Sequence, residues 1–365
     1  MNFDLNEDEE MLKALAERFV EDNYDLDRRR VYLGGPNGFS PQMWSLLAEL
    51  GLVAAPLSFE SGGLALDATA IATVFQALGK GLVVEPLIEN VMVGARLFER
   101  VAPADLAAEW LEALAMGARR IALAHAEHGA RGGRSYVETR VNADGTLSGA
   151  KSCVPAGAGV DGYIVTARES GAAGDAEGVG LFLVAGNAPG LTVTPWRTVD
   201  GSLAVTLDLA GVPATGLGGS LGDVAEVGVL ASLARSAEAL GVMQSLFDAT
   251  LEYLRTRQQF GTTLGSFQAI QHRMAAQYAA IEQGRALLDL AIVSQGSDRF
   301  AAAVDGLRAF VAPASVELGH EMIQFHGGMG VTDELFIGHG HKRLLMLSRW
   351  PDDGMAALDR FAGVA

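Results

Sequence analysis

The feature that most constrains this fold is a long helical pattern of apolar residues, interrupted once by a short polar segment. One face of a helix requires apolar side chains every three to four positions. That spacing is met by Leu230, Leu233, Ala237, Leu240, Phe247, Leu251 and Leu254, and again by Phe267, Ile270, Met274, Tyr278 and Ile281. Between them, residues 259–266 hold two glycines and two threonines and predict a turn. We therefore expect a hairpin of two antiparallel helices.

The secondary-structure pattern of the whole chain predicts an α+β fold. Residues 1–120 have helical periodicity, with Asn6, Ser40, Asp67 and Asp105 as expected N-terminal caps. Residues 121–221 hold short apolar runs separated by turn residues, which predicts a middle antiparallel β domain. Residues 222–365 return to the helical period and predict a C-terminal four-helix bundle, in which Pro313 should bend or break a helix.

Composition limits where the protein works and what it binds. A chain of 365 residues, 49% of them hydrophobic, can form two or three domains with a sizeable core. No apolar run is long enough to cross a bilayer and the N-terminal residues are acidic, so we expect a cytoplasmic protein without a membrane partner. The formal net charge of -17 argues against nucleic acid as a partner. Cys153 is the single cysteine, so neither an intrachain disulfide nor a cysteine-based metal site is expected.

Two motifs resemble the acyl-CoA dehydrogenase family, flavoproteins that oxidise the α,β bond of acyl-CoA thioesters. The run RTRQQFGTTLGSFQAIQHRMA begins at residue 255, at the predicted helical turn, and the glycine-rich run QFHGGMGVTDE begins at residue 324. The order of a helical, a β and a second helical segment is similar to that family over nearly the whole chain. The resemblance implies FAD as the cofactor, and it implies that residues of both motifs contact FAD across a subunit interface.

The first motif offers three side chains for this cofactor. Arg257 carries a planar, permanent charge suited to a pyrophosphate, Phe260 offers an aromatic face, and Gln268 offers an amide for the adenosine half. The alternative is structural. Arg257 would then pair with a nearby carboxylate such as Glu252, and Phe260 would belong to the core.

The second motif combines Gln324 with glycines that allow the backbone to approach a ligand closely. Gly327 and Gly328 lie at its centre, and the resemblance implies contact with the adenine-diphosphate end of a neighbouring subunit's FAD, hence at least a dimer. A glycine-rich loop is also a common helix end. His326 is interpreted as a structural histidine without a catalytic role.

The middle segment departs from the family pattern beside the expected flavin. The runs GAKSCVP from residue 149 and DGYIVTAR from residue 161 resemble the stretch that flanks the flavin ring. The family usually has Thr-Glu-Pro and, downstream, Gly-Ser-Asp, whereas this chain reads LAHAEHG from residue 123. A hydroxyl expected near the flavin is therefore absent.

A base must remove the α-proton of the thioester, and a carboxylate in an apolar pocket suits that task. Many family members carry it in a Tyr-Glu-Gly segment, where this chain reads WPDDG from residue 350 and Asp353 is the nearest substitute. Other members place it on the long helix, at a position occupied here by Ala231. Glu238 lies two turns further on, and its small neighbours, such as Gly241, suggest room for a substrate. Its alternative role is a surface ion pair with Arg235.

The sequence therefore supports two hypotheses. In the first, Glu238 abstracts the proton, FAD takes the hydride, and the electrons pass to an electron-transfer flavoprotein. The chain is similar to short bacterial members that act on CoA esters with bulky ring-bearing acyl groups and often combine two unlike chains. We expect a homo- or hetero-oligomer, a dimer or a tetramer. In the second hypothesis, the chain is a non-catalytic or half-site subunit of a hetero-oligomeric acyl-CoA dehydrogenase.

Overall fold

The computed structural model describes residues 5–130 and 134–363. The chain divides into two compact units, which are interleaved in sequence. The helical unit comprises Met1–Arg30, Asp67–Val83 and Ser232–Ala365. The sheet unit comprises Val31–Leu66 and Val84–Ala231. Within the described ranges, no helix is both long and apolar enough to span a membrane.

Three of the N-terminal helices begin at predicted caps, whereas a fourth expected cap, Asp105, lies inside its helix, after Pro103 at the N-cap position. The N-terminal helices are α1 (Glu7–Asn23), α2 (Leu26–Gly34), α3 (Pro41–Glu49), α4 (Ala68–Lys80), α5 (Arg96–Val101) and α6 (Ala104–Ala115). A π-helix, η2 (Leu87–Ala95), precedes α5, and η1 (Phe59–Ser61) and η3 (His128–Ala130) are short 3-10 turns. Asn6 Oδ1 accepts a hydrogen bond of 2.9 Å from the backbone N–H of Glu9. Asp67 and Ser40 cap α4 and α3 in the same way. These predicted caps are confirmed, because each supplies an acceptor to an unpaired first-turn N–H group.

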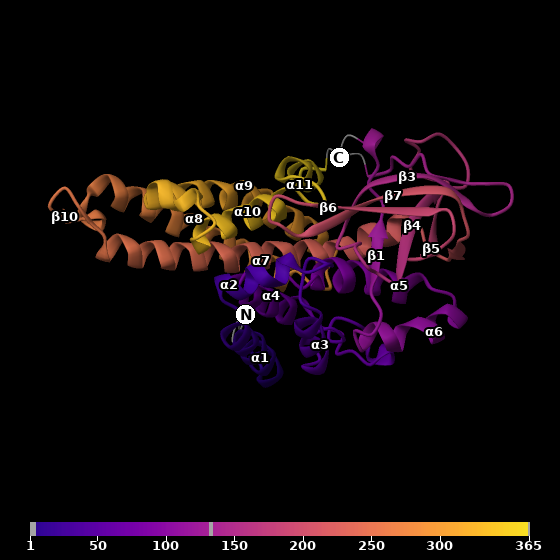
Figure 1. Cartoon of the computed structure of the whole chain (residues 1–365), viewed down its shortest axis with the longest axis horizontal. Coiled ribbons are helices and arrows are strands. Elements are labelled where there is room, and N and C mark those ends of the chain that lie inside the picture. The colour runs from indigo at the N-terminus through magenta and orange to yellow at the C-terminus, as the bar shows by residue number, and fades with distance from the viewer. Residues whose placement is uncertain (1–4, 131–133, 364–365) are drawn as a thin grey trace. The chain divides into compact units, whose positions relative to one another are not determined.

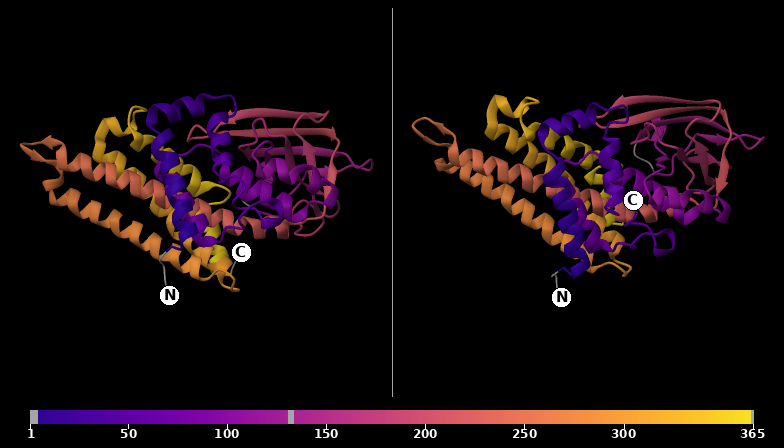
Figure 2. Two further views of the ribbon diagram at one scale, coloured as in Figure 1. Left: turned by 90° about the horizontal axis from the view of Figure 1, so that it is seen from below. Right: turned by 60° about the horizontal axis from the view of Figure 1, so that its bottom comes forward.

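Five further helices follow the sheet, and all but the first part of α7, before Ser232, belong to the helical unit. They are α7 (Leu221–Thr256), α8 (Gln268–Val293), α9 (Phe300–His326), α10 (Phe336–Arg349) and α11 (Gly354–Phe361). Helices α7 and α8 run side by side and are joined at one end by a small hairpin, as Figures 1 and 2 show. The hairpin consists of β9 (Gln258–Gln259) and β10 (Thr262–Thr263), followed by η4 (Leu264–Ser266). The predicted helical hairpin is confirmed, with a two-stranded turn that periodicity did not predict.

Helix α9 passes through Pro313 without ending, so of the two expected effects, a bend or a break, the break does not occur. Proline in a helix removes one backbone hydrogen bond, at a cost of about 3 kcal/mol. Helices α8, α10 and α11 all pack on α9, and Gly354 at the start of α11 lies close against the Pro313 ring. Burial against three helices outweighs the local penalty.

The sheet unit contains a mixed sheet. Its strands are β1 (Ile121–Ala124), β2 (Arg140–Val141), β3 (Leu147–Pro155), β4 (Gly162–Arg168), β5 (Val179–Ala185), β6 (Leu191–Arg197), β7 (Leu203–Val212) and β8 (Thr215–Leu217). The order is β6-β7-β3-β2-β4-β5-β8, with β1 added on β4. Most neighbours are antiparallel as predicted, but β1 and β2 both pair with β4 in parallel.

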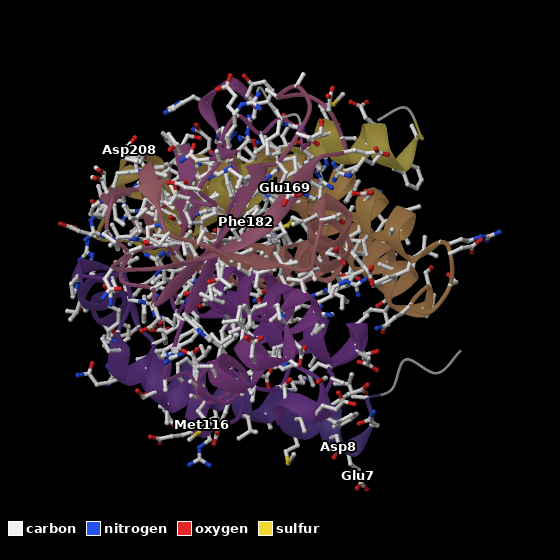
Figure 3. All side chains as sticks on the ribbon, turned by 90° about the vertical axis from the view of Figure 1, so that its right-hand side faces the viewer. Glu7, Asp8, Met116, Glu169, Phe182 and Asp208 are labelled. Atoms are coloured by element: carbon white, nitrogen blue, oxygen red, sulfur yellow. The ribbon has the colours of Figure 1, made fainter. Side chains whose placement is uncertain are left out.

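Alternating burial along β7 and nearly continuous burial along β4 and β5 build the core of this sheet. On β7, Leu207 and Leu209 are buried while Asp208 between them is exposed, and Phe182 on β5 is buried (Figure 3). Successive side chains of a strand point to opposite faces, so this pattern buries one face of β7. The α+β class is confirmed, with helices before and after a mixed sheet.

Candidate cofactor and active site

The tip of the α7–α8 hairpin holds an exposed aromatic residue in a strained conformation. Gln259 pairs with Thr262, so Phe260 and Gly261 form a two-residue turn with φ values of +56° and +81°. Such turns require positive φ at both positions, which a bulky side chain rarely adopts. Phe260 is 91% exposed, so the core alternative is wrong for this residue. An exposed, strained aromatic is typical of a residue that contacts a ligand or partner.

Arg257 lies between α7 and this hairpin, with its side chain exposed. Its backbone N–H donates to Tyr253 O at 2.8 Å, and its carbonyl accepts from Leu264 N at 2.9 Å. Across the described residues, its guanidinium has no ion-pair partner, so the alternative pair with Glu252 is not formed. The backbone is fixed while the charged group remains available for a phosphate.

The glycine-rich motif forms the end of α9 and the turn η5 (Gly327–Val331). Gln324, Gly327 and Gly328 are exposed, as is Gln268 at the first position of α8. A methyl group built on Gly327 or Gly328 would meet no heavy atom within 4 Å, so their backbone is open to a ligand. Gly330 differs, because a Cβ there would lie 2.6 Å from Ile323 O. Packing therefore requires Gly330, whereas Gly327 and Gly328 leave open space.

Contacts that periodicity did not predict hold the two motifs together. Tyr253 on α7 stacks on His326, with ring centroids 4.3 Å apart and an interplanar angle of 22°. Arg273 on α8 donates to both carboxylate oxygens of Glu321, at 2.6 and 2.8 Å. The same guanidinium lies over the Phe325 ring, 4.8 Å from its centroid. The end of α9 is thus attached to both helices of the hairpin.

Glu238 lies on α7 and is 5% exposed. Arg343 on α10 donates from Nε to Oε1 at 2.6 Å and from Nη2 to Oε2 at 2.9 Å. The alternative role of Glu238, a surface ion pair with Arg235, is therefore wrong, because the carboxylate is buried and bonded to another arginine. This bidentate geometry fixes the carboxylate plane and occupies one acceptor site on each oxygen.

The small residues around Glu238 accommodate a neighbouring helix. A Cβ on Gly241 would overlap the carbonyl oxygen of Gln76, and a Cβ on Gly79 would overlap the carbonyl oxygen of Glu238. Helices α4 and α7 are in backbone contact at these glycines. The room for substrate that the sequence suggested beside Gly241 is filled by α4.

Asp353, the other candidate base, caps α11. Its Oδ1 accepts hydrogen bonds from the backbone N–H groups of Met355 and Ala356, at 3.0 and 3.1 Å. The preceding Asp352 accepts from Arg308 Nε at 3.2 Å and from Arg360 Nη1 at 2.7 Å. This segment is therefore held by its own capping and by buried ion pairs.

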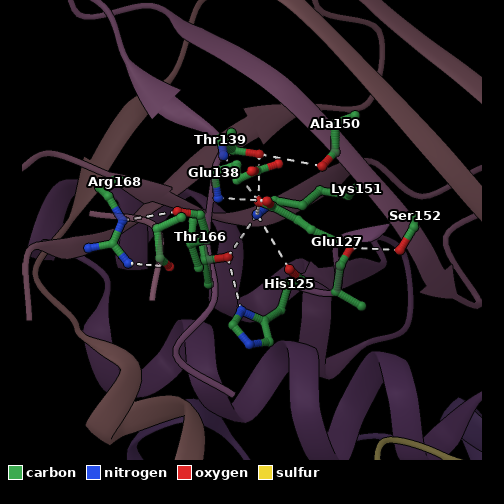
Figure 4. Close-up of polar contacts among 12 residues, drawn as sticks. His125, Glu127, Glu138, Thr139, Ala150, Lys151, Ser152, Thr166 and Arg168 are labelled. Carbon is green, nitrogen blue, oxygen red and sulfur yellow. Dashed lines mark hydrogen bonds and ion pairs between the residues drawn. The ribbon is translucent and has the colours of Figure 1, made fainter. Parts of the chain in front are cut away.

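The sheet unit contains a buried ionic cluster in the stretch that departs from the family pattern (Figure 4). Lys151 Nζ donates to Glu127 Oε1 at 2.6 Å and to Thr166 Oγ1 at 3.0 Å. Burial lowers the pKa of Lys151 to about 8, although Glu127 acts in the opposite direction. Burial raises the pKa of Glu127, but Lys151 and the hydrogen bonds from Glu138 N and Thr139 outweigh it, and the pKa lies below its usual value.

His125 completes the cluster in its neutral form. Lysine only donates, so the Thr166 hydroxyl accepts from Lys151 and donates to His125 Nδ1 at 3.0 Å. His125 Nε2 then donates to Arg134 O at 2.9 Å. Burial, reinforced by the Lys151 charge, lowers the pKa of His125 to about 4. His125 and Glu127 of the LAHAEHG stretch thus join Lys151 and Thr166 in one polar network.

The described residues of the helical unit fit a flavin dinucleotide. A guanidinium without an ion-pair partner among them, an exposed aromatic ring, two exposed amides and an open glycine turn match the pyrophosphate and aromatic groups of FAD. Comparison with protein-family models agrees. Residues 6–118 match the model for "Acyl-CoA dehydrogenase, N-terminal domain", and residues 231–350 match "Acyl-CoA dehydrogenase, C-terminal domain".

Curated relatives and solved structures match over nearly the full chain. Acyl-CoA dehydrogenase FadE27 of Mycobacterium tuberculosis is 30% identical, covering 92% of this chain and 90% of the relative. Acyl-CoA dehydrogenase IpdE2 of Mycolicibacterium smegmatis is 28% identical, covering 93% and 95%. A variant of the Tcur3481-Tcur3483 steroid ACAD is 27% identical with a TM-score of 0.87, over 98% of this chain and 97% of that one. The ChsE4-ChsE5 complex from Mycobacterium tuberculosis is 25% identical with a TM-score of 0.89, over 100% and 98%. The chain belongs to the acyl-CoA dehydrogenase family and is an oxidoreductase that uses FAD.

Proposed function

We propose that this protein catalyses the α,β-dehydrogenation of an acyl-CoA thioester, with Glu238 as the base and an electron-transfer flavoprotein as the electron acceptor. The observation that carries the proposal is a buried carboxylate on α7, held in a fixed plane by Arg343. A general base needs a defined position more than it needs free oxygens, and each oxygen of Glu238 retains a further acceptor site.

The cofactor and the residues of the site each have one role. FAD, when bound, supplies a two-electron acceptor for the hydride that leaves the β-carbon. Arg257, Phe260 and Gln268 bind the dinucleotide from the hairpin, and the backbone at Gly327 and Gly328, beside Gln324, approaches it from the second motif. Glu238 removes the α-proton, and Arg343 keeps its carboxylate oriented toward the same place in every turnover.

For the substrate we propose a CoA ester with a bulky, ring-bearing acyl group, handled by an oligomer of two unlike chains. The support comes from similar proteins. One related structure is named as a steroid ACAD, and the names of two related structures each join a pair of proteins. The exposed Phe260 and Arg257 also fit a site that a second subunit completes.

A half-site role is the second candidate, and a specific observation favours it. Both oxygens of Glu238 already bond Arg343, and Asp353 caps α11. His125 and Glu127, in the stretch that replaces the family's hydroxyl-bearing segment, join a polar network around Lys151. A chain with these features would hold FAD for its partner without acting as the base.

The visible spectrum of the purified protein separates the two candidates. A yellow protein that is bleached by an acyl-CoA supports the enzyme. A colourless chain that gains flavin only when co-expressed with a second chain supports the half-site subunit.

Substitution of the base tests the assignment within an active protein. Glu238→Gln should abolish flavin reduction while flavin stays bound, and Glu252→Gln, an exposed site on the same helix, should leave reduction unchanged. If flavin reduction is undiminished in Glu238→Gln, the assignment is wrong and Asp353 becomes the candidate base. Asp353→Asn then tests that role without removing the helix cap, because asparagine also caps helices.

A further inference from the structure

We propose that Tyr253 and His326 are positioning residues that set the distance between the two FAD-binding motifs. The inference rests on the proposed function, because it takes the hairpin and the glycine turn to bind one dinucleotide. The motifs are far apart in sequence, Arg257 on one side and Gly327 on the other. A ligand that contacts both motifs binds more tightly when the spacing of the motifs is already fixed, because ordering the motifs during binding reduces affinity.

Tyr253 is coupled directly to the first motif. Its carbonyl oxygen accepts the backbone N–H of Arg257 at 2.8 Å, so the two residues lie one helical turn apart at the end of α7. The Tyr253 ring is the surface on which His326 stacks, at a centroid distance of 4.3 Å. The position of the tyrosine ring therefore sets the position of α9 relative to Arg257.

His326 is coupled directly to the second motif. It is the last residue of α9, and Gly327 follows with φ of +61°, where the chain leaves the helix. His326 Nδ1 donates to Met322 O at 2.9 Å, because a carbonyl only accepts. The imidazole is thus held on one edge by its own helix and on one face by Tyr253.

The neighbouring contacts hold the same helix end from the other side. Arg273 on α8 bonds Glu321 through two hydrogen bonds and lies over the Phe325 ring. Phe325 and His326 are consecutive, so one faces α8 while the other faces α7. With α8 already holding this end, the Tyr253–His326 stack completes the attachment on the side that carries Arg257.

The test measures FAD affinity and backbone exchange in the full chain, with the partner chain present if flavin binding requires one. Tyr253→Leu removes the ring and keeps apolar bulk, whereas Tyr253→Phe keeps the ring. His326→Asn removes the stacking ring but retains a donor close to the Nδ1 position. Tyr278→Leu is the control, because Tyr278 on α8 forms an aromatic pair with Phe247 on α7 that does not involve α9.

Tyr253→Leu and His326→Asn should each weaken FAD binding about tenfold, the upper end of what one aromatic pair supplies. Tyr253→Phe and the control should stay within about twofold. In the flavin-free chain, amide exchange across residues 324–331 should be faster in Tyr253→Leu than in Tyr253→Phe. Thermal melting shows which variants are folded, and the two ring-removing variants test the stack independently.

The outcomes distinguish two failures. If the wild-type protein binds no flavin in any assembly, the proposed function fails, and this inference fails with it. If the wild type binds FAD and both ring-removing variants bind it equally well, with unchanged amide exchange, only the positioning role is overturned.

Discussion

The ion pair between Glu238 and Arg343 allows the sharpest quantitative prediction. Arg343→Met removes the guanidinium and keeps most of its apolar stem. The carboxylate left behind is 5% exposed, so water cannot replace the lost partner. Breaking a buried pair from one side costs about 3–5 kcal/mol, because a buried charge remains uncompensated.

That loss corresponds to a measurable change in melting temperature. The entropy of unfolding is about 2.1 cal/mol/K per residue, or about 0.8 kcal/mol/K for a chain of 365 residues. A loss of about 4 kcal/mol should therefore lower Tm by about 5 °C. Glu238→Gln should cost less, about 1–3 kcal/mol, since the Arg343 side chain that it leaves is 22% exposed and water can solvate it.

The assay is thermal unfolding followed by circular dichroism for both single variants and for the double variant. The double variant should be more stable than the sum of the two losses predicts, because Glu238→Gln removes the buried charge that Arg343→Met leaves uncompensated. Arg349→Met, an exposed site on the same helix, is the control and should change Tm by less than about 1 °C. If Arg343→Met had the same Tm as the Arg349→Met control, the buried ion pair would be refuted.

Three further predictions concern other parts of the protein. Lys151→Met should lower the free energy of unfolding by about 3–5 kcal/mol in chemical denaturation, because it leaves the buried Glu127 unpaired; a loss below about 1 kcal/mol would contradict the buried pair. His125 has a pKa of about 4 when folded and about 6.5 when unfolded, so the unfolded chain binds more protons between these values. His125 should contribute about 3 kcal/mol to the free energy of unfolding above pH 6.5, and this contribution should be lost as the pH falls toward 4. Between pH 7 and pH 4, Tm should therefore fall less steeply for His125→Gln than for the wild type. Gly241→Ala should cost about 1–3 kcal/mol by overlap with a backbone carbonyl of α4, whereas Gly228→Ala, which meets open space on the same helix, should be neutral or stabilising in the same melts.

Local sequence determined the helical hairpin and the helix starts. The apolar period around residues 223–281 and the caps at Asn6 and Asp67 depend on neighbours within a few positions, and the structure has them as predicted. The two-stranded turn at Phe260 was not predictable in the same way. The two turn positions are Phe260 and Gly261, where such a turn usually has Asn-Gly. The strained φ of Phe260 therefore appeared only in the folded chain.

The sequence by itself determined the family, the order of helical and β segments, and the residue types that suit a dinucleotide. Only the tertiary structure decided that Phe260 and Arg257 are exposed, and which partners the other charged and aromatic residues have. Glu238 pairs with Arg343, 105 positions away, and Tyr253 stacks on a histidine of another helix. Periodicity reports which face of a helix is buried, because burial repeats with the helix itself. It does not report what lies opposite that face, since that depends on how separate helices pack.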